Sequence, residues 1–144
     1  MTQADKDLLL KDLCARLPYD VRVEYNGTTL TNIFDVLGIA HGRIMLCLPF
    51  MSKTECPLIE EVKPYLFPLS SMTEEQESYL HFNTKFRLDI CNDLTVKNDE
   101  DGNYFYTDTY DYISLIDWLN KNHLDYRGLI EKGLALDATG LNIY

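Results

Sequence analysis

Apolar side chains recur at helical spacing at the start of the chain. Leu9, Leu13 and Leu17 follow one another every four residues, which places them on one face of a helix. Pro18 then ends the pattern, because proline has no amide hydrogen to donate to the preceding turn. The spacing predicts an N-terminal helix over residues 4–17. Its opposite face, which we expect to be solvated, carries side chains of mixed charge: Lys6, Asp7, Lys11, Asp12 and Arg16.

A strand and a tight turn are predicted directly after this helix. Apolar and charged side chains alternate over residues 21–25, as they do in a strand with one buried face. Asn26 and Gly27 follow, and both residue types tolerate the positive φ angles of a type I′ hairpin turn. We therefore expect a return strand over residues 28–34.

Two further strands complete the sheet that is expected over residues 20–69. Residues 43–48 have the length of a strand and are apolar from Ile44 onward, and residues 58–62 alternate less cleanly. Residues 62–69 contain two prolines, so we expect them to run extended along the outside of the sheet. Four short strands bury one face poorly unless the sheet curls or a helix covers it. The pattern predicts a small, strongly bent antiparallel sheet, SH3-like if it closes into a barrel, with the N-terminal helix as an available lid.

Helical signals return in the second half of the chain. Thr73 and Gln76 have the spacing of a capping box, in which each side chain bonds the amide of the other residue, so a helix is expected to begin there. Residues 94–96 and 104–106 flank a polar turn and predict a short hairpin. Helical spacing resumes over residues 110–122, and the remainder is expected to be a loop with one short strand.

These elements predict a single α+β domain over residues 1–144, with the sheet region at 20–69 and a helical and hairpin region at 73–144. An apolar fraction of 46% in 144 residues is typical of one globular core. No apolar run reaches the roughly 18 residues of a membrane helix. The first residues lack the basic and apolar regions of a signal peptide, so we expect a cytoplasmic protein.

The net charge of −10 narrows the classes of partner. Binding to DNA, RNA or anionic lipid requires clustered lysine and arginine, so no direct contact with nucleic acid or membrane is expected. Most of the negative charge lies in the second half, where residues 73–144 hold fourteen acidic side chains and six basic ones. A protein partner with a neutral or basic surface is therefore expected.

An acidic stretch interleaved with tyrosines, residues 93–117, is the main candidate for a binding surface. It holds seven carboxylates and a single basic residue, Lys97. Tyrosines give a large contact area at low entropic cost, while carboxylates steer a basic partner. The candidate partner-binding residues are Asp99, Glu100, Asp101, Tyr104, Tyr106, Asp108, Tyr110 and Asp111.

Two alternatives remain open for this stretch. The aromatic side chains can instead pack in the core of a hairpin and a helix, while the carboxylates only solubilise the outside. The acidic half can also act as a mimic of nucleic-acid phosphates and occupy the basic groove of a host nuclease, repressor or defence protein.

Tyr126 and Arg127 form a secondary candidate site. An arginine beside a tyrosine in a turn can bind a carboxylate or a phosphate. The alternative is that Arg127 only ties its loop to a helix C-terminus.

No catalytic, cofactor-binding or metal-binding residue is predicted. The sequence has no phosphate-binding glycine loop, no histidine pair at metal spacing and no Gly-x-Ser-x-Gly motif. The three histidines are dispersed, and no two cysteines have the two-residue gap of zinc or redox sites. We interpret Cys14 and Cys47 as small buried hydrophobes. A small enzyme whose site assembles only in the folded chain remains an alternative.

Four segments carry a resemblance to a known group of proteins. They are LLLKDLCARLPY at 8–19, EVKPYLFPLSSMTEE at 61–75, IDWLN at 116–120 and HLDYRGLIEKGLA at 123–135. In these segments the chain resembles small uncharacterised proteins encoded by phages and prophages of anaerobic gut bacteria. The resemblance implies expression inside a bacterial cell and a role in phage biology, but no activity and no residue role. With the acidic stretch, it predicts a non-enzymatic accessory protein that acts by contact with a host or phage protein.

Overall fold

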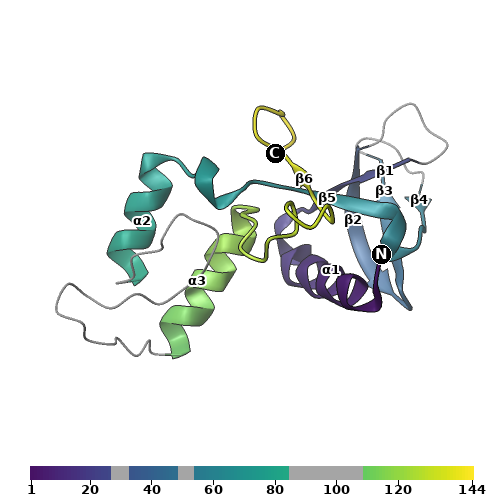
Figure 1. Cartoon of the computed structure of the whole chain (residues 1–144), viewed down its shortest axis with the longest axis horizontal. Helices are drawn as coiled ribbons and strands as arrows, with labels where there is room; N and C mark the ends of the chain where they lie inside the picture. The colour runs from purple at the N-terminus through teal and green to yellow at the C-terminus, as the bar shows by residue number, and fades with distance from the viewer. Residues whose placement is uncertain (27–32, 49–53, 85–108) are drawn as a thin grey trace.

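The computed structural model describes residues 1–26, 33–48, 54–84 and 109–144 (Figure 1), with the backbone alone for 80–84 and 109–112. The helices are α1 (Gln3–Arg16), α2 (Glu74–Thr84) and α3 (Thr109–Lys121). The strands are β1 (Arg22–Tyr25), β2 (Ile33–Ala40), β3 (Arg43–Cys47), β4 (Thr54–Glu55), β5 (Val62–Leu66) and β6 (Leu136–Asp137). Short 3₁₀ helices are η1 (Leu17–Tyr19), η2 (Ile59–Glu61) and η3 (Leu69–Ser71). The fold is α+β, as the sequence predicts.

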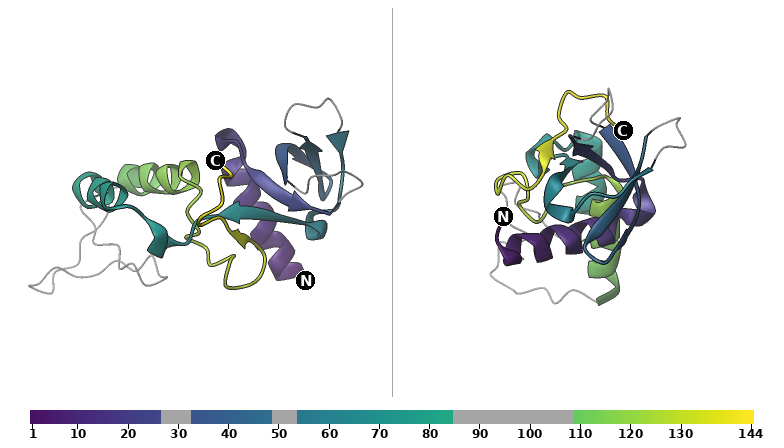
Figure 2. Two further views of the ribbon diagram at one scale, coloured as in Figure 1. Left: turned by 90° about the horizontal axis from the view of Figure 1, so that it is seen from above. Right: turned by 90° about the vertical axis from the view of Figure 1, so that its right-hand side faces the viewer.

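The described strands form one sheet in the order β4-β3-β2-β1-β5-β6. Neighbouring strands are antiparallel except β5 and β6, which are parallel. Strand β1 is central, since Val23 pairs with Phe34 on one side and with Pro64 on the other. The sheet is bent, with β2 and β3 turned away from β5 (Figures 1 and 2). The predicted antiparallel sheet is confirmed, and its closure into an SH3-like barrel stays a prediction.

The segment expected to be the fourth strand, residues 58–62, is mostly a turn. Residues Ile59–Glu61 form η2, and the Glu61 carboxylate closes it by accepting a hydrogen bond from the amide of Leu58 at 2.7 Å. Residues Val62–Leu66 then form β5 inside the sheet, so the prediction that they run along its outside is wrong. Pro64 is tolerated because the short β6 first pairs at Tyr65, which leaves Pro64 without a ladder partner on that side.

A two-residue turn, His41-Gly42, joins β2 to β3. Both residues have positive φ angles, 51° and 72°, as a type I′ turn requires. Strand β2 extends to Ala40, beyond the predicted end of the return strand. The expected turn at Gly27 and the start of that strand fall in residues 27–32, outside the described residues.

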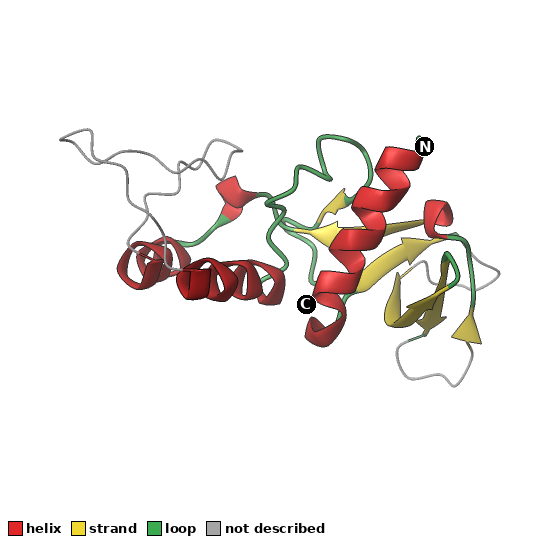
Figure 3. Ribbon diagram, turned by 90° about the horizontal axis from the view of Figure 1, so that it is seen from below, coloured by secondary structure: helices red, strands yellow, loops and turns green. Residues whose placement is uncertain are grey.

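Helix α1 lies across one face of the sheet and closes the main core (Figure 3). A capping box starts it, in which the Thr2 hydroxyl accepts a hydrogen bond from the amide of Asp5 at 3.2 Å. Leu9 and Leu13, on its predicted apolar face, are fully buried. They belong to one cluster with Val21, Val23, Phe34, Val36, Ile44, Leu46, Leu48, Ile59 and Val62. The predicted N-terminal helix is therefore confirmed.

Helices α2 and α3 lie side by side beyond one end of the sheet (Figures 1 and 2). The predicted capping box begins α2: the amide of Thr73 donates to Oε1 of Gln76 at 2.9 Å, and the amide of Gln76 donates to the Thr73 hydroxyl at 3.2 Å. Helix α3 confirms the helix predicted over residues 110–122. The hairpin predicted between 94 and 106 lies outside the described residues. No helix in the described part of the chain has the length and apolarity needed to cross a membrane.

The chain after α3 returns along β5. Phe67 and Leu124 form an isolated parallel bridge, and β6 pairs with Tyr65 and Leu66. Apolar clusters on this side join Leu66 to Leu129, Leu134 and Ala135, and Tyr65 to Ala138 and Ile143. This return places residues 120–127 and 143–144 beside α1 and β1, where the candidate site lies. The prediction of one domain over the whole chain stays a prediction.

Candidate functional site

Two charged residues of α1 are buried in an ion-pair cluster. Asp12 and Arg16 are both 0% exposed, so the prediction that they belong to a solvated face is wrong. The Arg16 guanidinium donates to Asp12 through Nε at 2.8 Å and through Nη2 at 3.1 Å. It also donates to the carbonyl oxygen of Leu124 at 2.8 Å. One turn of α1 thus faces the segment that follows α3, rather than water.

The secondary candidates, Tyr126 and Arg127, belong to the same cluster. Arg127 Nη1 donates to Asp12 Oδ1 at 3.1 Å, and its guanidinium lies 4.7 Å from the centroid of the Tyr126 ring. The Tyr126 hydroxyl donates to Oδ1 of Asn120 at 3.0 Å, and burial raises the pKa of Tyr126. The structure therefore brings Tyr126 and Arg127 together as a tie between this loop and α1. Their polar groups are already used inside the protein.

His123 lies beside this cluster in a constrained conformation. Helix α3 ends at Lys121, and His123 has a φ angle of 54°. Its carbonyl oxygen accepts a hydrogen bond from the amide of Phe67 at 2.9 Å, and the Phe67 carbonyl accepts one from the amide of Asp125 at 2.7 Å. These bonds hold the backbone of residues 123–125 against the end of β5.

The imidazole of His123 stacks on the ring of Tyr144. The ring centroids are 3.7 Å apart and the planes differ by 11°. The Tyr144 hydroxyl donates to the carbonyl oxygen of Tyr65 at 2.9 Å and accepts a hydrogen bond from the amide of Arg22 at 3.3 Å. The Arg22 guanidinium in turn donates to the carbonyl oxygen of Ile143. Two strands of the sheet therefore hold Tyr144 over His123.

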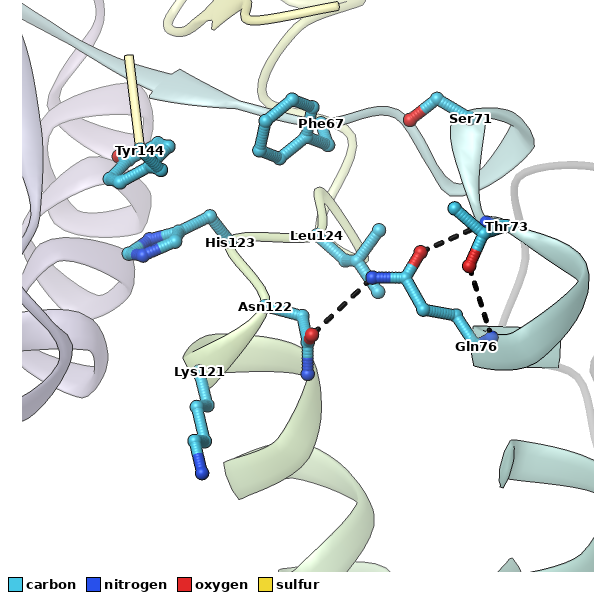
Figure 4. Close-up of a pocket in the computed structure, with 9 residues that line it drawn as sticks. All are labelled: Phe67, Ser71, Thr73, Gln76, Lys121, Asn122, His123, Leu124 and Tyr144. Atoms are coloured by element: carbon cyan, nitrogen blue, oxygen red, sulfur yellow. Dashed lines mark hydrogen bonds between the residues drawn. The ribbon is translucent and has the colours of Figure 1, made fainter. Parts of the chain in front are cut away.

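Two hollows, each of about 470 Å³, adjoin at this ring pair. We call them together the His123 recess, and they share Lys121, His123 and Tyr144. The first hollow is also lined by Phe67, Ser71, Thr73, Gln76, Asn122 and Leu124 (Figure 4). The second is also lined by Pro18, Tyr19, Asp20 and Arg22. A recess of this size accommodates a small molecule.

Desolvation shifts the pKa of both stacked rings. Desolvation, assisted by the positive charge of Arg16, lowers the pKa of His123 to about 4, so the imidazole is neutral at pH 7. Desolvation also raises the pKa of Tyr144 to about 12. Nδ1 of His123 is buried and has no hydrogen-bond partner within the described residues. The remaining charges that line the recess are the cations Arg22 and Lys121 and the carboxylate of Asp20.

The depressed pKa of His123 predicts a loss of stability in mild acid. The ordinary pKa is 6.5 and the folded value is about 4, so between these pH values the unfolded chain binds a proton that the folded chain does not. The free energy of unfolding should fall by on the order of 2 kcal/mol as the pH drops from 6.5 to 4. Urea unfolding of the wild type and of His123→Asn at several pH values measures this, since asparagine also tolerates a positive φ.

The same substitution at the other positive-φ histidine, His41→Asn, serves as the control. His41 is exposed in the turn between β2 and β3, so this variant should keep the pH dependence of the wild type. The interpretation is wrong if His123→Asn and the wild type lose stability in parallel between pH 6.5 and 4.

Most of the predicted acidic binding surface falls outside the described residues. This applies to Asp99, Glu100, Asp101, Tyr104, Tyr106 and Asp108. Tyr110 and Asp111 lie in the first turn of α3, where the structure describes the backbone alone. The surface therefore stays a prediction.

Along the sequence, α2 and α3 flank that stretch, and both helices are also acidic. Glu74 and Glu75 are exposed in the first turn of α2, and Asp117 is exposed on α3. Tyr79 of α2 stacks on Trp118 of α3, with ring centroids 5.2 Å apart and an interplanar angle of 12°. Tyr79 is 46% exposed, and Ile113 on α3 is 55% exposed. We call these exposed residues of the two helices, together with Trp118, the α2–α3 face.

The three cysteines that the structure describes, Cys14, Cys47 and Cys56, are free thiols. Cys14 is exposed and Cys47 is half-buried, so the prediction that Cys14 is a small buried hydrophobe is wrong. Position 14 lies next to the apolar stripe of α1 rather than within it. Among residues 1–26, 33–48, 54–84 and 109–144, no three His, Cys, Asp or Glu side chains are grouped so as to hold a metal ion.

Sequence reasoning did not identify the His123 recess. Its lining residues come from η1, β1, the segment between β5 and the first turn of α2, the end of α3 and residue 144. Because these segments are far apart in the sequence, no local motif marks the recess. Comparisons of the chain with protein-family models, with curated proteins and with solved structures find no match. The function therefore has to be argued from the residues themselves.

Proposed function

We propose that this protein is a non-enzymatic accessory protein of a phage or prophage, which acts in the bacterial cytoplasm by binding another protein. The partner would be a host or phage protein with a basic surface. The proposal rests on the sequence resemblance and on one structural observation: α2 and α3 expose apolar and aromatic side chains as well as carboxylates.

The apolar part of this face has the chemistry of an interface centre. Ile113 on α3 leaves more than half of its side chain in water, and the two helices also present a stacked aromatic pair, Tyr79 and Trp118. Aromatic residues supply most of the binding energy in many protein interfaces, because they bury a large area and lose little entropy. A single exposed isoleucine is ordinary, so the proposal takes the exposed apolar and aromatic side chains of the two helices together.

The charge of the helices favours a basic partner. Helix α2 carries Glu74, Glu75 and Glu77 with no lysine or arginine, and α3 carries two aspartates against Lys121. The candidate residues at 99–111 continue the same charge along the sequence. Carboxylates around an apolar centre accelerate association with a basic surface and disfavour acidic competitors.

Affinity capture from host lysate with paired variants tests this proposal. Ile113→Arg should reduce capture of the specific partner about tenfold or more, because it places a long cation where apolar contact and negative charge are expected. Raising the salt concentration should weaken capture by the wild type, since exposed charge pairs are screened. Recovery of each captured protein is quantified by mass spectrometry.

Leu37→Arg is the matched control. Leu37 on β2 is 56% exposed, almost the same as Ile113, and the substitution changes the net charge identically. It should leave capture unchanged. A third variant replaces Tyr104, Tyr106, Tyr110 and Asp108 by alanine and tests the predicted surface directly. Retention of every partner by both the Ile113 and the four-residue variant, with the fold intact, would contradict the proposal.

A further inference from the structure

We infer that the His123 recess binds a small organic anion, a carboxylate or a phosphate ester carried on a planar ring. This site is separate from the α2–α3 face and does not depend on the proposed protein partner. Its two hollows of about 470 Å³ each lie within the range of small-molecule sites in proteins.

The charge of the recess opposes that of the molecule as a whole. The protein has a net charge of −10, yet Lys121 and Arg22 face Asp20 alone among the charged residues that line the recess. Within the described residues Lys121 makes no ion pair, whereas Arg22 is paired with Asp35 at 3.1 Å. Lys121 is therefore the cation that is available to a ligand, and the fixed Arg22 adds to the positive potential.

An unpartnered polar group lies in the wall of the recess. His123 is 7% exposed and lines both hollows, and its buried Nδ1 has no hydrogen-bond partner within the described residues. A buried polar atom without a partner is destabilising, so such atoms commonly mark a missing water or ligand. Because Nδ1 is enclosed by protein atoms, the ring has to shift before this neutral imidazole can donate a hydrogen bond to an anionic oxygen in the recess.

The other walls suit a planar ring. Phe67 and Tyr144 lie with their centroids 6.0 Å apart, and the stacked His123 ring continues this aromatic wall (Figure 4). Across the hollow, the Gln76 amide donates to Asn122 at 3.3 Å, and the Asn122 amide donates to the carbonyl oxygen of Trp118 at 2.8 Å. These side chains are already held by internal hydrogen bonds, so the recess is formed before a ligand enters.

Nuclear magnetic resonance of the full chain tests the inference with defined probes. Phenyl phosphate and benzoate carry a ring and an anion, inorganic phosphate carries an anion alone, and benzyl alcohol carries a ring alone. Phenyl phosphate or benzoate should shift the resonances of His123, Lys121 and Tyr144 at saturable concentrations, and the preferred probe identifies the anion. A bound anion should also raise the pKa of His123 above its value of about 4, because the anion stabilises the imidazolium form.

Lys121→Gln and Lys11→Gln form a matched pair of variants. Both lysines are exposed and both substitutions make the net charge one unit more negative, but Lys11 lies on α1 away from the recess. Lys121→Gln should weaken binding of the preferred probe roughly tenfold, and Lys11→Gln less than twofold. Equal weakening by the two variants, equal binding of benzyl alcohol, or no response of His123 to any anion would overturn the inference.

Discussion

Replacing Asp12 by alanine is expected to lower the free energy of unfolding by about 3–5 kcal/mol, because the substitution leaves the charge of Arg16 buried without its carboxylate. Asp12 and Arg16 are both fully buried, and two of the hydrogen bonds donated by Arg16 go to Asp12. Arg16 Nη1 already lacks a partner within the described residues. Chemical denaturation followed by circular dichroism measures the loss.

The control for this prediction is Asp7→Ala on the same helix. Asp7 is exposed, and its removal should change the stability by no more than about 0.5 kcal/mol. The double variant Asp12→Leu/Arg16→Met removes both charges and should recover much of the lost stability, because an apolar pair of similar volume can replace a buried ion pair. Equal stability of the Asp7 and Asp12 single variants would show that the buried cluster does not form.

Replacing Leu119 by alanine is expected to lower the free energy of unfolding by about 2–5 kcal/mol, through lost apolar burial and the cavity that remains. Leu119 is fully buried on α3 and packs in one cluster with Leu69, Leu115 and Leu124. Its carbonyl oxygen also accepts a hydrogen bond at 3.0 Å from the amide of Leu124, the residue after His123. Chemical denaturation again gives the magnitude.

Ile113→Ala tests whether this loss depends on burial rather than on helix propensity. Ile113 belongs to the same helix but is 55% exposed, so the change should cost less than about 1 kcal/mol. Amide hydrogen exchange should show faster opening of α3 in Leu119→Ala and unchanged opening in Ile113→Ala. Similar losses in the two variants would mean that α3 does not pack through Leu119.

The elements that sequence predicts well are those with local signals. Leu9 and Leu13 have helical spacing and Pro18 ends it, so α1 follows from the first eighteen residues. Thr73 and Gln76 satisfy each other across three residues, so the start of α2 needs no tertiary information. The fold class follows from these helices and from the alternating residues of β1.

The features that sequence misses depend on distant partners. Asp12 looks solvated on a helical wheel, and only the approach of Arg127, 115 residues later, shows that it is buried. The position of β5 depends on the turn closed by Glu61 and on pairing with β1. The His123 recess needs Arg22, Lys121 and Tyr144 to converge, and no spacing in the sequence encodes that. The acidic stretch at 93–117 stays a functional prediction, because most of its candidate residues lie outside those described.

The parallel pairing of β5 with β6 has a consequence for how the last segment of the chain is held. Tyr65 pairs with Leu136, so this ladder closes a loop of about 70 residues. The turn between β2 and β3 closes a loop of only two residues. The longer closure costs roughly 3 kcal/mol more in chain entropy, which a ladder of two residue pairs does not offset. Burial of Leu129, Leu134 and Ala138 supplies the difference. Strand β6 is therefore a result of apolar packing by the returning chain, and not the contact that brings the chain back.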